Sequence, residues 1–403
     1  MTTTETGRTP RYAASSGTPG ALVIGGDYQG LGIARSLGRR GIPVAVLDDE
    51  VSIAPSSRYV QHALRVPTLR SSEATTGALY EAARRFGLDG WVLFPTREET
   101  VAAVAQNRDE LARIFRVPTP PWETVRVAWD KRQTYRVAER LGIEVPRCWF
   151  PRSESDLSEI AFDGPVIIKP AIKEHFFYET GAKAWQANDP AELLQKFRLA
   201  TAIIPAEEVI VQELVPGGGE RQLAYCAFVK HGEPVGTMTV VRRRQHPSDF
   251  GRASTFVETV DLPELEAPSL RLLREMDYYG LVELEYKRDS RTGAVKLLDV
   301  NARTWGYHGL GAAAGVDFPT LLYSDQLGLP VHPCRARAGV RWVRLATDVP
   351  NALRDISHRR LRAADYLRSL RGIDVGAVWA ADDPRPVLAE LGILPHLAIR
   401  RGL

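Results

Sequence analysis

Two short apolar stretches near residue 290 carry side chains whose types and spacing could bind a divalent cation. The stretches LVELEY and AVKLLDV flank residues 289–293, whose Asp, Ser and Gly residues favour a reversing loop. The pattern predicts a β-hairpin with Glu285 and Asp299 on neighbouring strands. Asn301 should point to the same face as Asp299, because it lies two residues farther along. Such oxygen ligands suit Mg²⁺ that also bridges phosphates, although a surface hairpin with solvated acids is an alternative.

Two further segments have features of a nucleotide site. Residues 165–170 read PVIIKP, a buried type of strand that ends in Lys169. Residues 209–215 read VIVQELV and lead into a Pro-Gly-Gly-Gly turn, with Glu220 seven residues after Glu213. Such a hinge could offer backbone groups to an adenine edge, while a carboxylate accepts hydrogen bonds from ribose hydroxyls. Lys169 also fits the alternative of a strand-edge lysine whose amino group reaches solvent.

The order of these elements resembles the ATP-grasp superfamily of carboxylate–amine and carboxylate–thiol ligases. The resemblance extends from about residue 20 to about residue 330 and leaves the rest of the chain outside it. No single element is specific, but their order and spacing together are. The matching residues are Asp130, Lys131, Lys169, Glu213, Leu214, Val215, Glu220, Glu285, Asp299, Asn301 and Arg303.

The resemblance implies a role for each nucleotide-binding residue. Lys131, at the start of a predicted helix, would contact the nucleotide. Lys169 would bind the α- and β-phosphates and take part in catalysis. Glu213, Leu214 and Val215 would form the hinge around adenine, and Glu220 would bind the ribose.

The resemblance also implies a metal site and a catalytic arginine. Glu285, Asp299 and Asn301 would form a magnesium triad. Arg303 would reach the γ-phosphate or an acyl-phosphate. The family often has glutamate where this chain has Asp299, and the shorter side chain should still bind the metal.

The segment expected to cover the phosphates departs from the family pattern. ATP-grasp proteins usually have several glycines after the strand lysine, and glycines let backbone amides approach phosphates closely. Residues 171–183 of this chain contain a single glycine, Gly181. Lys183 could supply charge instead. Residues 175–178 could pack over the nucleotide or the acceptor, or could belong to a structural loop.

The implied reaction is ATP-dependent ligation. A carboxylate would attack the γ-phosphate to give an acyl-phosphate and ADP, and an amine would then displace phosphate to form an amide. The cofactors would be ATP and Mg²⁺. Two alternatives are another ATP-grasp chemistry, namely carboxylation or thiol ligation, and a non-catalytic nucleotide- or NAD-binding module.

The amino-terminal part predicts a Rossmann-like βαβ unit. Residues 21–24 form an apolar run followed by Gly25, Gly26 and Gly30, and a second run ends in Asp48. This pattern permits NAD binding, but its glycine spacing departs from GxGxxG. The run that ends at Pro95 is followed by Arg97 and Glu98. Both residues are candidate substrate contacts, because ligands bind at the carboxyl ends of strands in such sheets; the start of a helix is the alternative.

We therefore expect a multidomain α/β and α+β protein. The predicted parts are a disordered tail (1–19), a Rossmann-like domain (20–125), two ATP-grasp subdomains (126–215 and 216–334) and an arginine-rich extension (335–403). The 403 residues, 44% of them hydrophobic, suffice for two or three cores.

Composition excludes several other classes of protein. The three cysteines are widely spaced and predict neither a disulfide framework nor a zinc site. No apolar run approaches the length of a membrane span, and residues 1–19 lack the apolar core of a signal peptide. We expect a cytoplasmic protein whose net charge of +3 is too small to indicate nucleic-acid binding overall.

The arginines are nevertheless clustered. Residues 335–372 contain ten arginines and three acids, a balance that could dock an acidic carrier protein or a tRNA, although such arginines are more often solvated or paired. A homodimer is a further expectation from the family. Arg244 and Arg252 lie in or beside a second basic stretch and are candidate contacts of the small-molecule carboxylate and amine substrates.

Overall fold

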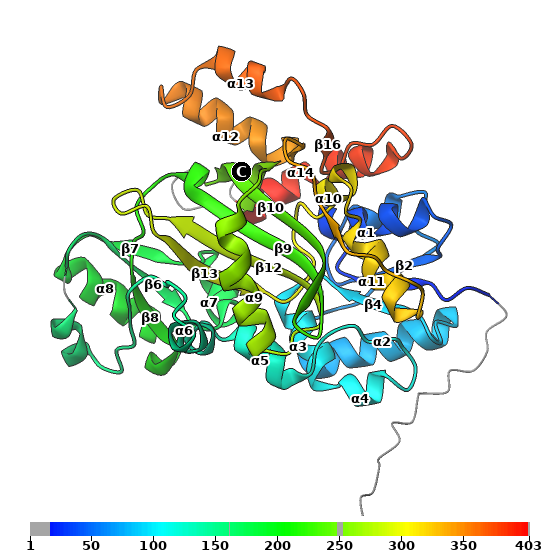
Figure 1. Cartoon of the computed structure of the whole chain (residues 1–403), viewed down its shortest axis with the longest axis horizontal. Coiled ribbons are helices and arrows are strands. Elements are labelled where there is room, and N and C mark those ends of the chain that lie inside the picture. Colours follow the sequence, from blue (N-terminus) through cyan, green and yellow to red (C-terminus); the bar gives the residue numbers. More distant parts are fainter. Residues whose placement is uncertain (1–16, 161, 248–252, 402–403) are drawn as a thin grey trace, which may run out of the picture.

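The computed structural model describes residues 17–160, 162–247 and 253–401, which form three β-sheets with helices packed on them (Figure 1). The fold is mixed α/β, as the sequence predicts. Figure 1 shows the first sheet (blue to cyan) and the second sheet (teal to green) on opposite sides of the third, which lies in the middle. Most of the predicted tail and all of Arg252 lie outside the described residues.

The first sheet has four parallel strands in the order β3-β2-β1-β4. The strands β1, β2 and β4 are short, buried and almost wholly apolar, which suits a parallel sheet covered on both faces, whereas β3 at the edge is partly exposed. Gly30 allows the first helix to pack closely, because a Cβ atom there would lie 2.1 Å from the carbonyl oxygen of Gly25. The elements of this part are β1 (Ala21–Ile24), α1 (Tyr28–Gly38), β2 (Val44–Asp48), β3 (His62–Arg65), α2 (Ser72–Phe86), β4 (Val92–Pro95), α3 (Glu98–Gln106) and α4 (Arg108–Leu111).

The second sheet has four antiparallel strands in the order β5-β8-β6-β7. Its core contains Ile168, Phe176 and Phe197. The helix before this sheet, α6, begins at Lys131, and the Asp130 side chain caps it by accepting a hydrogen bond from the backbone of Arg132. The elements are α5 (Trp122–Trp129), α6 (Lys131–Arg140), β5 (Cys148–Trp149), β6 (Val166–Pro170), α7 (Lys173–Thr180), β7 (Trp185–Ala187), α8 (Pro190–Thr201) and β8 (Val209–Glu213).

The third sheet has eight strands, seven of them in the order β13-β12-β9-β10-β11-β15-β16, with β14 paired to β10. The predicted hairpin is confirmed: β12 and β13 are antiparallel, and Glu285 lies opposite Asp299. Val282 and Leu284 alternate with the acids of β12 and pack in the core against α9. The elements are β9 (Gln222–Lys230), β10 (Glu233–His246), β11 (Ala253–Thr259), α9 (Glu266–Glu275), β12 (Gly280–Arg288), β13 (Val295–Asn301), α10 (Gly309–Ala314), α11 (Phe318–Gln326), β14 (Cys334–Arg335), β15 (Arg341–Val343) and β16 (Val375–Gly376).

The carboxy-terminal residues connect the third sheet to the first. β15 pairs with β11 inside the third sheet, and the buried Asp383 accepts hydrogen bonds from Arg35 of α1 and from Ser57. The predicted boundary between residues 334 and 335 falls inside β14, and the one between 125 and 126 falls inside α5. The remaining helices are α12 (Leu345–Ser357), α13 (Ala363–Leu370) and α14 (Arg385–Arg401).

Helix length and polarity bear on membrane association. Among the described residues, every helix is too short or too polar to cross a bilayer.

Candidate functional site

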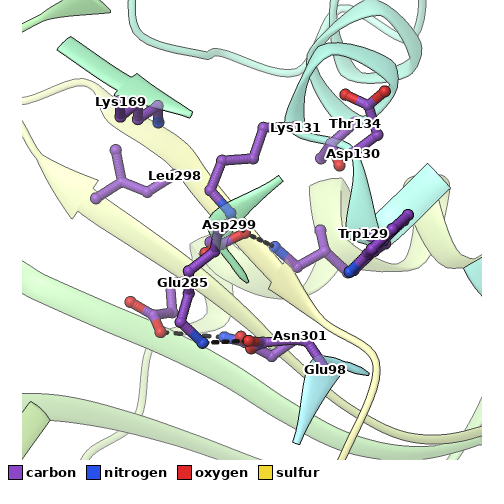
Figure 2. Close-up of polar contacts among 12 residues, drawn as sticks. Glu98, Trp129, Asp130, Lys131, Thr134, Lys169, Glu285, Leu298, Asp299 and Asn301 are labelled. Atoms are coloured by element: carbon purple, nitrogen blue, oxygen red, sulfur yellow. Dashed lines mark hydrogen bonds and ion pairs between the residues drawn. The ribbon is translucent and has the colours of Figure 1, made fainter. Parts of the chain in front are cut away.

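The β12–β13 hairpin gathers carboxylate and amide side chains on one face. Asn301 Nδ2 donates hydrogen bonds to Glu283 Oε2 at 3.0 Å and to Glu285 Oε1 at 3.1 Å. Figure 2 shows Asn301 beside Glu285, and Asp299 on the same strand facing Lys131. The three residues predicted to bind magnesium therefore lie together at the end of the hairpin.

Lys131 connects α6 to this hairpin. Its Nζ atom lies 2.7 Å from Asp299 Oδ1. Burial alone would lower the pKa of Lys131, but the charge of Asp299 raises it above its usual value. The same ion pair lowers the pKa of Asp299 against the opposing effect of burial. Both groups are thus charged near neutral pH.

Lys169 lies deeper, at the end of β6, and is only 8% exposed. Its Nζ atom donates a hydrogen bond of 2.6 Å to the hydroxyl of Tyr135, which also accepts one from Gln212 and donates one to the carbonyl of Leu298. Burial, together with the positive charge of Lys131, lowers the pKa of Lys169 to about 8. The strand-edge alternative is wrong, because the amino group of Lys169 points into the protein rather than into solvent.

The predicted hinge lies at the carboxyl end of β8. The Glu213 side chain is paired with Lys296 of β13 and accepts a hydrogen bond of 3.1 Å from the backbone of Arg147. Glu213 and Leu214 line a cavity of about 730 Å³ between the second and third sheets. Val215 is buried and Glu220 is exposed, so only part of the hinge faces this cavity.

Arg303 follows the hairpin and meets Glu98 from α3. Its Nη2 atom lies 2.5 Å from Glu98 Oε1 and 3.1 Å from Asn301 Oδ1. Lys173 pairs with the other oxygen of Glu98. Burial alone would raise the pKa of Glu98, but Arg303 and Lys173 hold it well below its usual range. The carboxylate of Glu98 therefore fixes both cations beside the predicted metal-binding residues.

The segment predicted to cover the phosphates is a helix. Residues 173–180 form α7, and Gly181 ends it with a positive φ of 65°, which explains the single glycine. Phe176 packs in the core of the second sheet, and Tyr178 donates a hydrogen bond to Glu99. Lys183 follows the helix and lines a large cavity together with Glu285.

That cavity has a volume of about 490 Å³ and lies between the first and third sheets. It is within the range of small-molecule sites. Its lining includes Arg97, Glu98, Lys183, Glu285, Arg303 and Arg344. The carboxyl ends of the first sheet thus meet the hairpin face across a common cavity. The substrate contacts predicted for Arg97 and Glu98 stay predictions.

Asp48 is held by contacts inside the first sheet. It accepts a hydrogen bond of 2.6 Å from the backbone of Gly26 and pairs with Arg97. Arg97 also pairs with Asp49 at 2.5 Å. Because Asp48 is only 3% exposed, its carboxylate is not available to the ribose of a dinucleotide in this arrangement.

Arg244 is bound by the carboxy-terminal helices. Its Nε and Nη2 atoms each lie 2.8 Å from an oxygen of Asp348, and Nη1 lies 2.8 Å from Ser369 Oγ. These contacts give Arg244 a structural role between β10 and α12. The substrate contact predicted for Arg244 stays a prediction.

A magnesium ion would need ligands beyond acidic and imidazole side chains. Among the described residues, no three His, Cys, Asp or Glu side chains are arranged to hold a metal by themselves. Two carboxylates with Asn301 Oδ1 provide hard oxygens but an incomplete shell, which suits an ion completed by phosphate oxygens and water. In the structure each of these oxygen donors faces a cationic side chain. Glu285 faces Arg242, Asp299 faces Lys131, and Asn301 faces Arg303.

Several residues of this site are absent from the sequence prediction. Glu283 has the local signal of lying two residues before Glu285, on the same strand face. Tyr135 lies one helical turn after Lys131, so both point to the same side of α6. Gln212 precedes the hinge glutamate directly. Lys173 has no such signal, because its contact with Glu98 spans 75 residues.

Comparison with known proteins gives one relative by sequence. No family model matches the chain. The sequence is 23% identical over 305 residues to a D-aspartate ligase of Enterococcus faecium (strain Aus0004), and the alignment covers 70% of each chain.

Solved structures extend the comparison to the fold. An L-amino acid ligase from Bacillus licheniformis matches with a TM-score of 0.58 and 15% identity, over 77% of this chain and 74% of that one. N5-carboxyaminoimidazole synthetase from Staphylococcus aureus matches with a TM-score of 0.62 and 13% identity, over 84% and 86% of the two chains. The latter enzyme has also been solved with ADP, where the TM-score is 0.59, the identity 12% and the coverage 78% and 79%. At these identities the likeness shows the fold.

Proposed function

We propose that this chain, which has the fold of the ATP-grasp ligases, is an ADP-forming ligase that joins a carboxylate to an amine. The observation that carries the proposal is that Lys131, Asp299, Asn301 and Arg303 line one small pocket, in which Lys131 pairs with Asp299 and Arg303 donates a hydrogen bond to Asn301. Arg303 also lines the cavity of about 490 Å³, together with Glu285. Charge neutralisation and positioning are what phosphoryl transfer requires of a protein.

The nucleotide would lie between the second and third sheets. Its adenine would occupy the cavity beside Glu213 and Leu214, with Glu220 at the ribose. Its phosphates would extend past Lys169 to Lys131, and Lys183 would add charge from the end of α7. Tyr135 spans this path through its hydrogen bonds to Lys169 and Leu298, so it would have to move when ATP binds.

Magnesium would be held by Glu285, Asp299 and Asn301 together with phosphate oxygens. It would neutralise phosphate charge and align the triphosphate. Lys131 and Arg242, which neutralise the two carboxylates in the structure, would then be released to contact phosphates or substrate.

The protein's own groups would act as follows. Lys131 and Lys169 balance the charge that develops as the substrate carboxylate attacks the γ-phosphate. Arg303, fixed by Glu98, stabilises the acyl-phosphate and then the oxyanion formed when the amine attacks. The cavity beside Arg97 and Glu98 receives the carboxylate and amine substrates.

The domain organisation is part of the proposal. The strand order β3-β2-β1-β4 with intervening helices supports a Rossmann-like first domain at residues 20–125. The second and third sheets correspond to the two ATP-grasp subdomains, and residues 335–403 extend the third. Docking of an acidic carrier or a tRNA, a homodimer and a cytoplasmic location stay predictions.

The test is ADP release from MgATP with a panel of carboxylic acids, each with and without amines. ADP that forms only when an acid and an amine are both present would support the proposal. ADP formed with bicarbonate or with thiols in place of amines would favour the alternative ATP-grasp chemistries. Absence of ATP binding in calorimetry would contradict the nucleotide site itself.

A further inference from the structure

Arg344 is a buried arginine whose side-chain donors are incompletely used. It follows β15 and precedes α12, and its backbone N–H donates a hydrogen bond to the carbonyl of Thr255 at 2.9 Å. The residue is only 2% exposed. Its guanidinium lies over the ring of Tyr28 from α1, with Cζ 3.9 Å from the ring centroid. The side chain is therefore held in a defined position at the junction of the first and third sheets.

Two acids form long ion pairs with this guanidinium but do not satisfy all of its hydrogen-bond donors. Asp27 Oδ1 lies 3.5 Å from Nη1, and Glu390 Oε1 lies 3.4 Å from Nη2. Within the part of the chain that the structure describes, neither Nε nor Nη1 of Arg344 has a hydrogen-bond partner. A buried donor without a partner costs free energy that a bound acceptor would recover.

Arg244, on the neighbouring β10, provides a comparison within the same protein. It also stacks on an aromatic ring, that of Phe256. Unlike Arg344, it forms close hydrogen bonds with both oxygens of Asp348. The guanidinium of Arg244 is therefore satisfied by Asp348, whereas Arg344 keeps N–H groups available to an acceptor.

Arg344 lines the cavity of about 490 Å³ that also contains Arg303 and Glu285. Three aromatic rings lie between Arg344 and the hairpin. The ring centroid of Trp342 lies 6.1 Å from that of Tyr28 and 6.2 Å from that of Tyr307. Tyr307 donates a hydrogen bond to Glu283, which contacts Asn301. A single small molecule in this cavity would thus have one end at Arg344 and the other toward the reacting groups.

We propose that Arg344 binds the α-carboxylate of an α-amino acid substrate, a group that the reaction does not consume. The proposal rests on the ligase function proposed above and defines its substrate class. A guanidinium presents paired N–H donors that match a carboxylate. Asp27 borders the same cavity, and an acid beside an arginine suits a zwitterion better than a simple anion. The residue that selects the substrate would then come from the carboxy-terminal extension.

The amino acid could be either reactant. As the amine substrate it would present its α-carboxylate to Arg344 and its amine to the acyl-phosphate. As the acid substrate it would react through a side-chain carboxylate while Arg344 binds its α-carboxylate. Steady-state kinetics distinguish these cases, because only the substrate bound by Arg344 should show an altered KM in a variant.

The test compares alanine, aspartate and glutamate, in both enantiomers, with their α-carboxamides in the wild type, Arg344→Gln and Arg344→Lys. Binding is measured by calorimetry without ATP, and turnover is measured by ADP release. The wild type should prefer the free acid of at least one amino acid to its carboxamide. Arg344→Gln should raise KM for that acid about tenfold or more, as expected for loss of a charge-assisted contact, and should abolish the preference. Arg344→Lys keeps the positive charge and should retain part of the preference for the free acid.

Arg341→Gln is the matched control, because Arg341 belongs to β15 and pairs with the acid of Glu258. It should leave the preference unchanged. Wild-type turnover with an unaltered preference in both Arg344 variants would overturn the inference and leave the ligase intact. Binding that depends on Arg344 without ADP release would support the inference and overturn the ligase. If the protein shows no binding and no turnover, both the inference and the proposed ligase function are overturned.

Discussion

Lys131 and Asp299 form an ion pair of 2.7 Å that joins the first residue of α6 to β13. The two residues are 168 positions apart in the sequence. The pair connects the helix that precedes the second sheet to the hairpin of the third. In the structure, the lysine neutralises a carboxylate that we propose as a magnesium ligand. ATP binding would therefore exchange partners at Asp299 rather than introduce charge into an apolar site.

Asp299→Asn should strongly reduce ligation without unfolding the protein. The substitution removes one metal-binding charge, and we expect turnover to fall by on the order of 10²–10³. The control is Asp325→Asn, which removes the carboxylate partner of Lys230 in an ion pair of 2.9 Å outside the site. Circular dichroism checks folding. Turnover of Asp299→Asn equal to that of the control would contradict the metal assignment.

ATP binding should be accompanied by proton uptake near pH 8. Burial lowers the pKa of Lys169 to about 8 in the free protein, and a bound triphosphate would raise it by favouring the charged form. The binding enthalpy should therefore depend on the ionisation enthalpy of the buffer. Lys169→Met should lose this dependence, and Lys196→Met, which changes a half-buried lysine of α8 that pairs with Glu192, should retain it. A buffer-independent enthalpy in the wild type would contradict the prediction.

Glu174 should make the protein less stable as the pH rises toward neutrality. Burial and the charge of Glu98 raise its pKa from 4.5 to about 7. Between these values the folded state binds more protons than the unfolded state, so the free energy of unfolding falls as the pH increases. Urea denaturation at about pH 5 and about pH 7 should show this fall in the wild type, and Glu174→Gln should reduce it. Glu179→Gln, exposed on the same helix, should behave like the wild type.

Tyr135→Phe should destabilise the protein. The change removes the hydroxyl that accepts hydrogen bonds from Lys169 and Gln212, and both of these donors are buried. Loss of their partner should lower the free energy of unfolding by about 1–3 kcal/mol. Tyr80→Phe is the control, because that hydroxyl has only a 3.5 Å contact with Glu110. Equal denaturation midpoints for the two variants would contradict the role of Tyr135.

The features that sequence predicts well are local ones. The hairpin could be predicted because period-two alternation and a turn segment lie within about twenty residues of each other. The helix α7 was not predicted, because one glycine in a polar segment fits a loop as well as a helix end. Its position depends on Phe176 packing in the core of the second sheet, which a single sequence does not reveal.

The contacts that complete the site are long-range. Arg303 and Glu98 are 205 residues apart, and each is unremarkable in its own segment. Arg344 stacks on Tyr28 only because the carboxy-terminal residues return to the first sheet. The resemblance ends before this segment, so it gave no indication that Arg344 borders the cavity.

The most direct test follows oxygen from the carboxylate substrate. Once the panel has identified an acid and an amine, the acid is labelled with ¹⁸O, and the released phosphate is analysed by ³¹P NMR. Activation as an acyl-phosphate predicts that ¹⁸O from the carboxylate appears in inorganic phosphate, with ADP as the other product. Formation of AMP, or phosphate without the label, would contradict the central claim.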